Sequence, residues 1–354
     1  PSGSVVSSPA VVNGTVYIGG SDSNLYAVDT STGQSEWVFD EPSGDITSSP
    51  TVTNNNVYFG SYDSNIYAVN AETGSRVWTC TVASEPINSS AVVVDGTVYI
   101  GSGDSNVYAI DAENGDVLWT YTDPSAQIWS SPTVVDGTLY VGSYDTNVYA
   151  VDAETGNREW VFTEPTEKIP NTPTVYNGIV YVGTWGGNFY ALDAETGQQE
   201  WVADIVAGGG NGATVIDNTV YTGSDEGKLH ALDATTGDQQ WVFDEPTHYV
   251  RSSPTIVDGR IYVGSSDGTL YAIDAETDGD SEDSRINQGI LGHHYEWVER
   301  DGDDSPSIEE YASEDGIIET TGLFDAVEDW RNNEIAVALL LEVISAWRSE
   351  RSVV

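Results

Sequence analysis

Histidines and clustered carboxylates are the residues of this chain whose types and spacing could support catalysis or metal binding. The chain has four histidines, of which His293 and His294 are adjacent and follow Asp278, Asp280 and Asp283. Such a group could bind a metal ion adventitiously, but its spacing does not fit a tetrahedral site. We therefore interpret it as part of an exposed acidic loop.

The sequence contains little that indicates a catalytic nucleophile or a phosphate-binding site. Cys80 is the only cysteine, which excludes an internal disulfide and a multi-cysteine metal site, and we predict a buried, inert thiol. No segment matches a phosphate-binding loop. We therefore predict no catalytic residues and a protein that is not an enzyme.

A different signal comes from two sets of positions that recur about every 41 residues and change residue type each time. The first set reads Val6, Thr47, Asn88, Trp129, Pro170, Gly210 and Arg251. The second reads Ser21, Tyr62, Gly103, Tyr144, Trp185, Asp225 and Ser266. Large aromatics with an arginine are the usual anchors of recognition surfaces. Drift on an exposed loop would leave a similar pattern, but we predict a ligand- or partner-binding site made by Trp129, Arg251, Tyr144, Trp185, Tyr62 and Asn88.

The charge of the chain limits its partners. It carries 57 acidic and 11 basic residues, for a formal net charge of −46, and only Lys168 and Lys228 are lysines. Phosphate binding needs lysine and arginine, so nucleic acid and anionic membranes are excluded as partners. The surface resembles that of proteins from extreme halophiles. Because the Debye length falls to about 3 Å at 1 M salt, we predict a protein that folds at molar salt.

The sequence gives only indirect information on location. No stretch reaches the roughly 18 apolar residues of a membrane-spanning helix, so no transmembrane segment is predicted. The chain begins at Pro1 and contains no methionine, and we interpret it as a processed or truncated product without its signal peptide. An extracellular or cell-surface location is the expectation.

Internal repeats predict the architecture that positions the candidate site. Tryptophans recur at steps of 41 residues, or 40 at the last step, as Trp37, Trp78, Trp119, Trp160, Trp201 and Trp241. A second series contains seven members, Tyr26, Tyr67, Tyr108, Tyr149, Tyr190, His230 and Tyr271. We assign the seventh tryptophan to Trp297 and interpret residues 278–294 as a polar insertion in the last repeat.

Each repeat contains four short runs of strand character separated by turn residues. In the fourth repeat they are Ser131 to Val135, Thr138 to Gly142, Asn147 to Asp152 and Glu159 to Phe162, with Asp136-Gly137 as a hairpin turn. Four antiparallel strands in about 41 residues match one propeller blade. We predict an all-β protein in which residues 1–300 form a seven-bladed β-propeller of four-stranded antiparallel blades.

The pattern Ala-x-Asp-x-x-Thr-Gly-x-x-x-Trp, seen at Ala150 to Trp160 and Ala191 to Trp201, resembles the tryptophan-docking motif of pyrroloquinoline-quinone (PQQ) type propeller repeats. The resemblance implies that each indole packs against the neighbouring blade. The quinone-dependent dehydrogenases with such repeats are larger eight-bladed rings with a vicinal cysteine pair and a bound calcium. This chain departs from that pattern, so neither PQQ nor another cofactor is expected.

After the repeats the pattern changes. Residues 301–310 form an acidic linker, and residues 311–354 carry two amphipathic patterns that predict a small helical hairpin. This piece resembles the dockerin-like modules that end many exported archaeal proteins. With Gly316 at the sixth position, the third, fifth and ninth positions of a calcium loop are Ser313, Asp315 and Glu319. The first and twelfth positions lack a carboxylate, so the loop is degenerate and calcium is only a weak expectation.

Together these features predict a non-enzymatic binding or scaffold propeller of the cell envelope, which engages a protein partner through one rim face. The chain is similar in this respect to the propeller lipoprotein that supports outer-membrane protein assembly. A carbohydrate- or small-molecule-binding propeller, with a glycan as partner, is the alternative, and a PQQ-dependent dehydrogenase is a more remote one. A monomer is expected.

Overall fold

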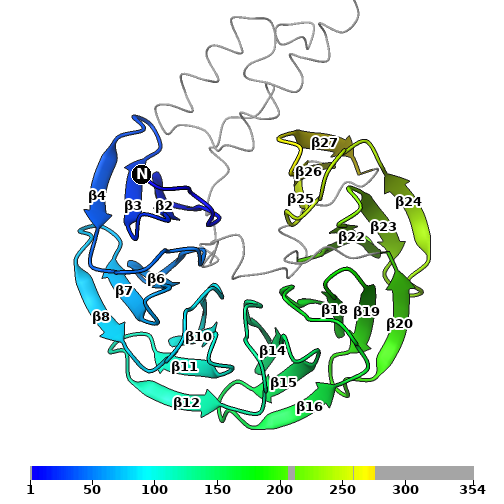
Figure 1. Ribbon diagram of the computed structural model, residues 1–354, viewed down its shortest axis with the longest axis horizontal. Coiled ribbons are helices and arrows are strands. Elements are labelled where there is room, and N and C mark those ends of the chain that lie inside the picture. Colours follow the sequence, from blue (N-terminus) through cyan, green and yellow to red (C-terminus); the bar gives the residue numbers. More distant parts are fainter. Residues whose placement is uncertain (1, 206–211, 258, 276–354) are drawn as a thin grey trace, which may run out of the picture.

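The computed structural model describes residues 2–205, 212–257 and 259–275, and this part of the chain is all-β. Its strands form seven separate antiparallel sheets, six of four strands and one of three, in which sequence neighbours pair. The sheets are arranged around a central axis, as Figure 1 shows, with the fourth strand of each complete sheet on the circumference. The predicted seven-bladed propeller is confirmed.

The strands of the first four blades follow the repeat closely. In chain order they are β1 (Ala10–Val12), β2 (Thr15–Gly19), β3 (Leu25–Asp29), β4 (Ser35–Phe39), β5 (Thr51–Thr53), β6 (Asn56–Gly60), β7 (Ile66–Asn70), β8 (Arg76–Cys80), β9 (Val92–Val94), β10 (Thr97–Gly101), β11 (Val107–Asp111), β12 (Val117–Tyr121), β13 (Thr133–Val135), β14 (Thr138–Gly142), β15 (Val148–Asp152) and β16 (Arg158–Phe162).

Blades 5 to 7 continue the same order. Their strands are β17 (Thr174–Tyr176), β18 (Ile179–Gly183), β19 (Asn188–Asp193), β20 (Gln199–Asp204), β21 (Thr214–Ile216), β22 (Thr219–Gly223), β23 (Leu229–Asp233), β24 (Gln239–Phe243), β25 (Thr255–Val257), β26 (Arg260–Gly264) and β27 (Leu270–Asp274). The fourth strand predicted at Trp297, the insertion at 278–294, the linker at 301–310 and the helical module at 311–354 lie outside the described residues.

The first hairpin of each blade depends on residues that tolerate a positive φ. Between β13 and β14, Asp136 has φ of 49° and Gly137 of 85°, and Val135 pairs directly with Thr138. Two successive positive φ values define the two-residue turn that matches the twist of paired strands. The hairpin predicted at Asp136-Gly137 is therefore confirmed.

Tryptophan joins neighbouring blades at five of the blade boundaries in the described part of the chain. Five indoles donate a hydrogen bond from Nε1 to an alanine carbonyl of the following blade, at 2.9–3.0 Å, namely those of Trp37, Trp78, Trp119, Trp160 and Trp201. The ring of Trp160 also lies against Gly197, where a Cβ would be 2.6 Å from the indole. Gly197 has φ of +69°, so both its space and its backbone favour glycine.

The turn between the second and third strands is held by an aspartate in five of the blades. In blade 2, Asp63 Oδ2 accepts hydrogen bonds from the Tyr67 hydroxyl at 2.8 Å and from the Ser43 backbone N–H at 2.8 Å. Burial, helped by the hydrogen bond to Asp63, raises the pKa of Tyr67 to about 12. Equivalent tyrosine–aspartate bonds occur at Asp22, Asp104, Asp145 and Asp267.

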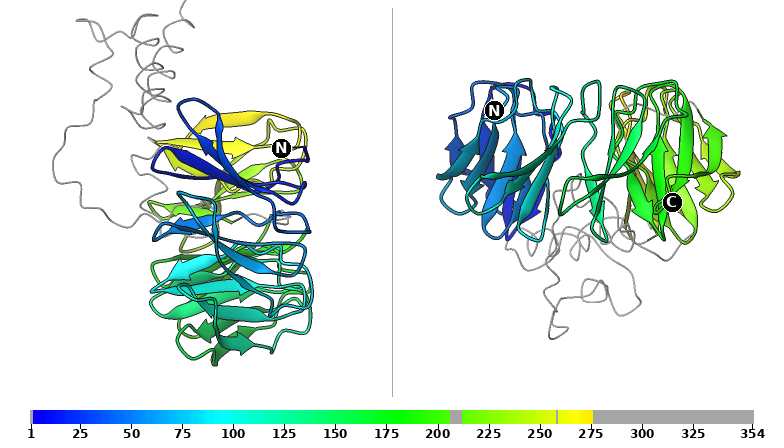
Figure 2. Two further views of the ribbon diagram at one scale, coloured as in Figure 1. Left: turned by 90° about the vertical axis from the view of Figure 1, so that its left-hand side faces the viewer. Right: turned by 90° about the horizontal axis from the view of Figure 1, so that it is seen from below.

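Backbone hydrogen bonds place these turns beside the loops that connect the blades. Tyr62 donates its N–H to Asp45, Tyr144 to Gln127 and Trp185 to Lys168, at 2.9–3.0 Å. The connecting loops and the turns between second and third strands therefore share one face of the ring, which we call the rim face. The side views of Figure 2 show the blades at one level around the axis, so the propeller is a disc.

No helix within the described residues is long and apolar enough to cross a membrane.

Candidate functional site

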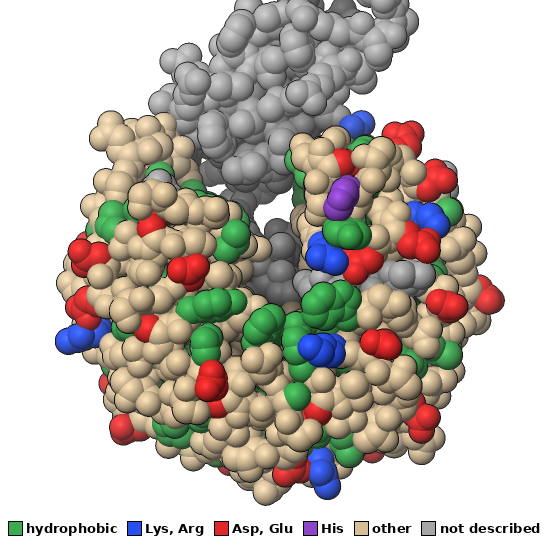
Figure 3. All heavy atoms as spheres, in the orientation of Figure 1, with side chains coloured by type: hydrophobic (Ala, Val, Ile, Leu, Met, Phe, Trp, Pro, Cys, Tyr) green, Lys and Arg blue, Asp and Glu red, His purple; other side chains and the backbone are tan. Residues whose placement is uncertain are grey.

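A pocket of about 330 Å³ opens on the rim face. Hydrophobic side chains gather near the centre of this face, with lysine and arginine beside them, while most acidic side chains are scattered toward the circumference (Figure 3). The pocket is lined by Ser8, Thr47, Ser49, Asn88, Ser90, Trp129, Ser131, Tyr144, Pro170, Thr172, Trp185 and Arg251. Five of the six predicted binding residues are therefore brought together around one pocket.

Three aromatic side chains form one wall of the pocket. The ring centroids of Trp129 and Tyr144 are 5.0 Å apart, and those of Tyr144 and Trp185 are 6.3 Å apart, with interplanar angles of 51° and 52°. Trp185 is 44% exposed. The indole N–H of Trp129 is buried and has no partner among the described residues. Burial raises the pKa of Tyr144, so its hydroxyl stays protonated and can donate a hydrogen bond at neutral pH.

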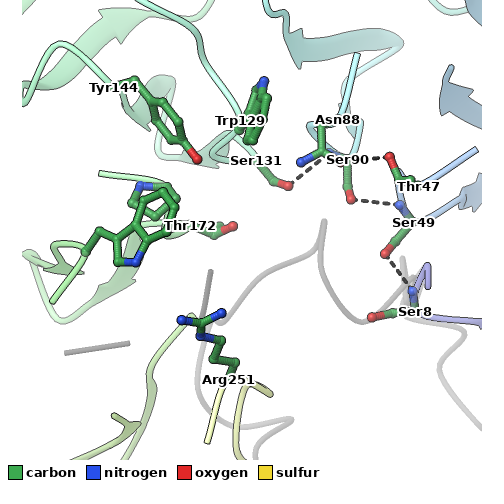
Figure 4. Close-up of a pocket in the computed structure, with 12 residues that line it drawn as sticks. Ser8, Thr47, Ser49, Asn88, Ser90, Trp129, Ser131, Tyr144, Thr172 and Arg251 are labelled. Carbon is green, nitrogen blue, oxygen red and sulfur yellow. Dashed lines mark hydrogen bonds between the residues drawn. The ribbon is translucent and has the colours of Figure 1, made fainter. Parts of the chain in front are cut away.

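One cation lies over this wall, and another lines the pocket across from Trp129 and Tyr144 (Figure 4). The Lys168 ammonium lies 4.5 Å from the Tyr144 ring centroid and 5.9 Å from that of Trp185. Arg251 lies 4.3 Å from the ring centroid of Tyr249 and forms a two-point ion pair with Asp225, at 2.7 and 3.0 Å. The hydrogen bond to Asp225 raises the pKa of Arg251. The guanidinium is thus held in a fixed orientation, and part of its charge is balanced.

A row of hydroxyls crosses the pocket from blade to blade. The Oγ of Ser49 accepts the N–H of Ser8, that of Ser90 accepts the N–H of Ser49, and that of Ser131 accepts the N–H of Ser90, each at 2.9 Å. Figure 4 shows this row running toward Trp129 and Tyr144, with Arg251 on the opposite side. Beside it, the Thr47 hydroxyl donates to Asn88 Oδ1 at 2.7 Å.

Tyr62 is the predicted site residue that does not line the pocket. It is 37% exposed at the same turn position of blade 2 on the rim face. Sequence reasoning left out the serine row and Lys168. The serines repeat in most blades, as scaffold residues do, and Lys168 occupies neither of the two recurring sets, so neither pattern indicates a binding role. The candidate calcium ligands Ser313, Asp315 and Glu319 lie outside the described residues.

The buried histidine belongs to the scaffold. His230 takes the place of the repeat tyrosine and its Nδ1 lies 3.0 Å from Gln239 Oε1. Burial lowers the pKa of this histidine, so the neutral form is favoured. Within residues 2–205, 212–257 and 259–275, no three His, Cys, Asp or Glu side chains come together as a possible metal-binding group.

Comparison with protein families identifies the family of this propeller. The model of the family described as outer membrane protein assembly factor BamB matches residues 1–91, 62–213 and 186–282. The chain belongs to the BamB family. The matched segments cover the described blades and overlap one another, as expected when one repeat can align in more than one register.

Solved and curated proteins add two similarities. The crystal structure of BamB from Moraxella catarrhalis has the same fold, with a TM-score of 0.66 and 22% sequence identity over 76% of this chain and 85% of that one. A laccase of Haloferax volcanii is 50% identical over 42 residues, about one blade. That match spans 12% of this chain and only 7% of the laccase.

Proposed function

We propose that this chain is a non-enzymatic binding propeller of the cell envelope that holds a protein partner on its rim face. The observation that carries the proposal is the contact of Trp129, Tyr144 and Trp185 at the mouth of one pocket. Tryptophan, tyrosine and arginine dominate the binding energy of protein interfaces. Here they are assembled in advance, which reduces the cost of ordering them on binding.

Departures from the repeat support a selected site over random drift. Blades 1 to 4 and blade 7 have an aspartate at the turn position, but blade 5 has Gly186 and blade 6 has Glu226. The Ser-Ser pair of the inner loop is likewise replaced by Asn171-Thr172 and Asn211-Gly212 in these two blades. The turns and loops of the same two blades carry Trp185, Lys168 and Asp225. Scaffold residues are therefore replaced in the blade that carries Trp185 and Lys168 and in the next one, which carries the Asp225 partner of Arg251.

The chemistry of the pocket supports a binding role over catalysis. None of its twelve lining residues is an aspartate, glutamate, histidine or cysteine. The serine and threonine hydroxyls that line it could act as nucleophiles only with an adjacent general base, which is most often a histidine or a carboxylate. A quinone cofactor with calcium would also lack carboxylate ligands here. Lining of this kind is suited to holding a ligand through aromatic contacts and hydrogen bonds.

The family description, outer membrane protein assembly factor, supports an envelope location for this chain. We place this chain at the cell surface or outside the cell, as a monomer adapted to molar salt by its net charge of −46. Residues 311–354 would then provide a second docking element, with calcium at Ser313, Asp315 and Glu319 as a weaker expectation.

The row of serine hydroxyls favours a second candidate function, the binding of a carbohydrate or another small molecule in the pocket. A pocket of about 330 Å³ is at the lower end of the range for small ligands. The two candidate functions differ in the contact area of what is bound. A protein would cover a broad patch that includes Tyr62, whereas a small ligand would contact only the pocket lining.

Affinity capture from native envelope extract at about 3 M NaCl tests the proposal, since surface attraction is screened there. The baits are the intact chain, Trp185→Ala, Tyr62→Ala and, as a control on the outer strand β12, Leu118→Ala. Trp185 is 44%, Tyr62 37% and Leu118 53% exposed, so all three variants should fold. We expect one protein to be retained by the intact chain and the control, and at least about tenfold less by the Trp185 and Tyr62 variants.

Two results would contradict the proposed protein partner. The first is that the intact chain retains no protein. The second is that Leu118→Ala lowers retention as much as the rim variants do. Loss of a bound sugar in Trp185→Ala with an unchanged Tyr62→Ala would favour the second candidate.

A further inference from the structure

The pocket is rich in hydrogen-bond donors. The Oγ atoms of Ser49, Ser90 and Ser131 each accept a backbone N–H, and a hydroxyl that accepts still has its own proton to donate. Among the described residues, none of these three hydroxyls donates a hydrogen bond. Three neighbouring blades therefore present a donor each to the pocket.

Asn88 and Arg251 add further donors. The carbonyl Oδ1 of Asn88 is occupied by the Thr47 hydroxyl at 2.7 Å, which fixes the amide and leaves its NH₂ group without an acceptor among the described residues. The Nε and Nη2 of Arg251 are engaged by Asp225, whereas Nη1 makes no hydrogen bond within the described residues. Each side chain is thus positioned by one contact and retains N–H groups for another.

Acceptors are scarce around the same space. The chain has 57 acidic residues, yet none lines the pocket, and Asp225 beside it is already paired with Arg251. Lys168 adds a positive charge 4.5 Å from the Tyr144 ring and forms no ion pair with any described carboxylate. Unpaired donors are best satisfied by a ligand that brings acceptors, and hydrogen bonds with a charged partner are the strongest.

The aromatic wall indicates the class of ligand that would bring these hydrogen-bond acceptors. Trp129, Tyr144 and Trp185 present apolar ring surface beside the polar row, so one side of the ligand must be apolar and the rest rich in oxygen. The C–H face and hydroxyl edge of a sugar ring combine these properties. The size of the pocket, about 330 Å³, suits one or two such rings.

We propose that the pocket binds a sugar that carries a carboxylate, with the ring against the aromatic wall and the carboxylate toward Arg251. This inference rests on the second candidate function and names the class of ligand. A cationic ligand is disfavoured, since no carboxylate lines the pocket to pair with it. A neutral sugar would satisfy the hydroxyl row but bring no charged acceptor to Arg251, whose Nη1 is not engaged by Asp225.

Titration with two sodium salts and one neutral sugar tests this assignment on the full chain at about 3 M total sodium. Sodium glucuronate replaces an equal amount of NaCl, disodium N-acetylglutamate replaces twice its own amount, and glucose is added at constant NaCl, so total sodium stays constant and charges remain strongly screened. Ligand-observed NMR reports binding. We expect glucuronate to bind about tenfold or more tightly than either glucose or N-acetylglutamate.

Matched double variants connect the preference to the pocket. Arg251→Gln/Asp225→Asn removes the cation without leaving a part-buried carboxylate unpaired, and it should weaken glucuronate to the affinity of glucose. Arg158→Gln/Asp123→Asn removes a similar ion pair, at 2.7 Å, that does not line the pocket and should leave all affinities unchanged.

Each other outcome overturns the assignment in a distinguishable way. Equal binding of glucose and glucuronate would contradict the carboxylate but leave the small-molecule function standing. Equal binding of N-acetylglutamate would contradict the sugar. If none of the three binds, both the inference and the second candidate function fail, whereas the protein-capture result is unaffected.

Discussion

Replacing Trp160 with alanine is expected to lower the free energy of unfolding by about 3–5 kcal/mol, because a large buried side chain is lost and a cavity remains. Trp160 is 8% exposed and packs on Tyr140 with ring centroids 5.8 Å apart. Its Nε1 donates to the Ala194 carbonyl at 2.9 Å, across the boundary between blades 4 and 5. The measurement is denaturant unfolding at about 3 M salt.

Trp185→Ala is the matched control, since it removes the same side chain from an exposed position. Its stability should stay within about 0.5 kcal/mol of the intact chain, as for most surface substitutions. Gly197→Ala should reproduce part of the Trp160 effect, because the added Cβ meets the indole at 2.6 Å. An unchanged unfolding midpoint for Trp160→Ala would show that the indole does not hold the blades together.

The salt concentration is expected to change the stability of the folded chain more than the Trp160→Ala substitution does. At about 50 mM NaCl the chain should lose its cooperative unfolding transition, and at about 3 M it should show a single one. The net charge is −46, and four of the six described lysines and arginines are already in ion pairs with carboxylates. Repulsion among the remaining carboxylates extends over about 10 Å at 0.1 M salt and only about 3 Å at 1 M. Circular dichroism during thermal unfolding, repeated across NaCl concentrations, measures the effect.

Sucrose separates screening from a general stabilising effect of solutes. It is excluded from protein surfaces and favours the folded state without screening charge. We therefore expect 1 M sucrose at low salt to restore much less of the transition than 1 M NaCl. A cooperative transition at 50 mM NaCl with the same midpoint as at 3 M would show that the acidic surface does not require salt.

The architecture could be predicted because its determinants are local and repeated. The spacing of the tryptophans predicts the length of one blade. Asp136-Gly137 predicts a two-residue turn, because both residue types tolerate the positive φ values found there. The grouping of Trp129, Tyr144 and Trp185 was also predictable, since equivalent positions of successive blades must lie side by side on one face of a ring.

Contacts that depend on side-chain direction could not be predicted from the sequence. Arg251 pairs with Asp225, 26 residues earlier in the chain, and this reduces its role as a free cation. The ammonium of Lys168 lies over the rings of Tyr144 and Trp185, although neither recurring set contains this residue. The serine row repeats as scaffold does and also lines the pocket, so repetition alone cannot separate the two roles.

The central claim is that a partner binds the rim face around the pocket lined by Trp129, Tyr144 and Trp185. Site-specific photo-crosslinking tests it most directly, with Trp185→benzoylphenylalanine as the probe and Leu118→benzoylphenylalanine as the control, both irradiated in native envelope extract at about 3 M salt. We predict a discrete crosslinked protein from position 185 and none from position 118. No product from position 185, or the same products from both positions, would contradict the claim.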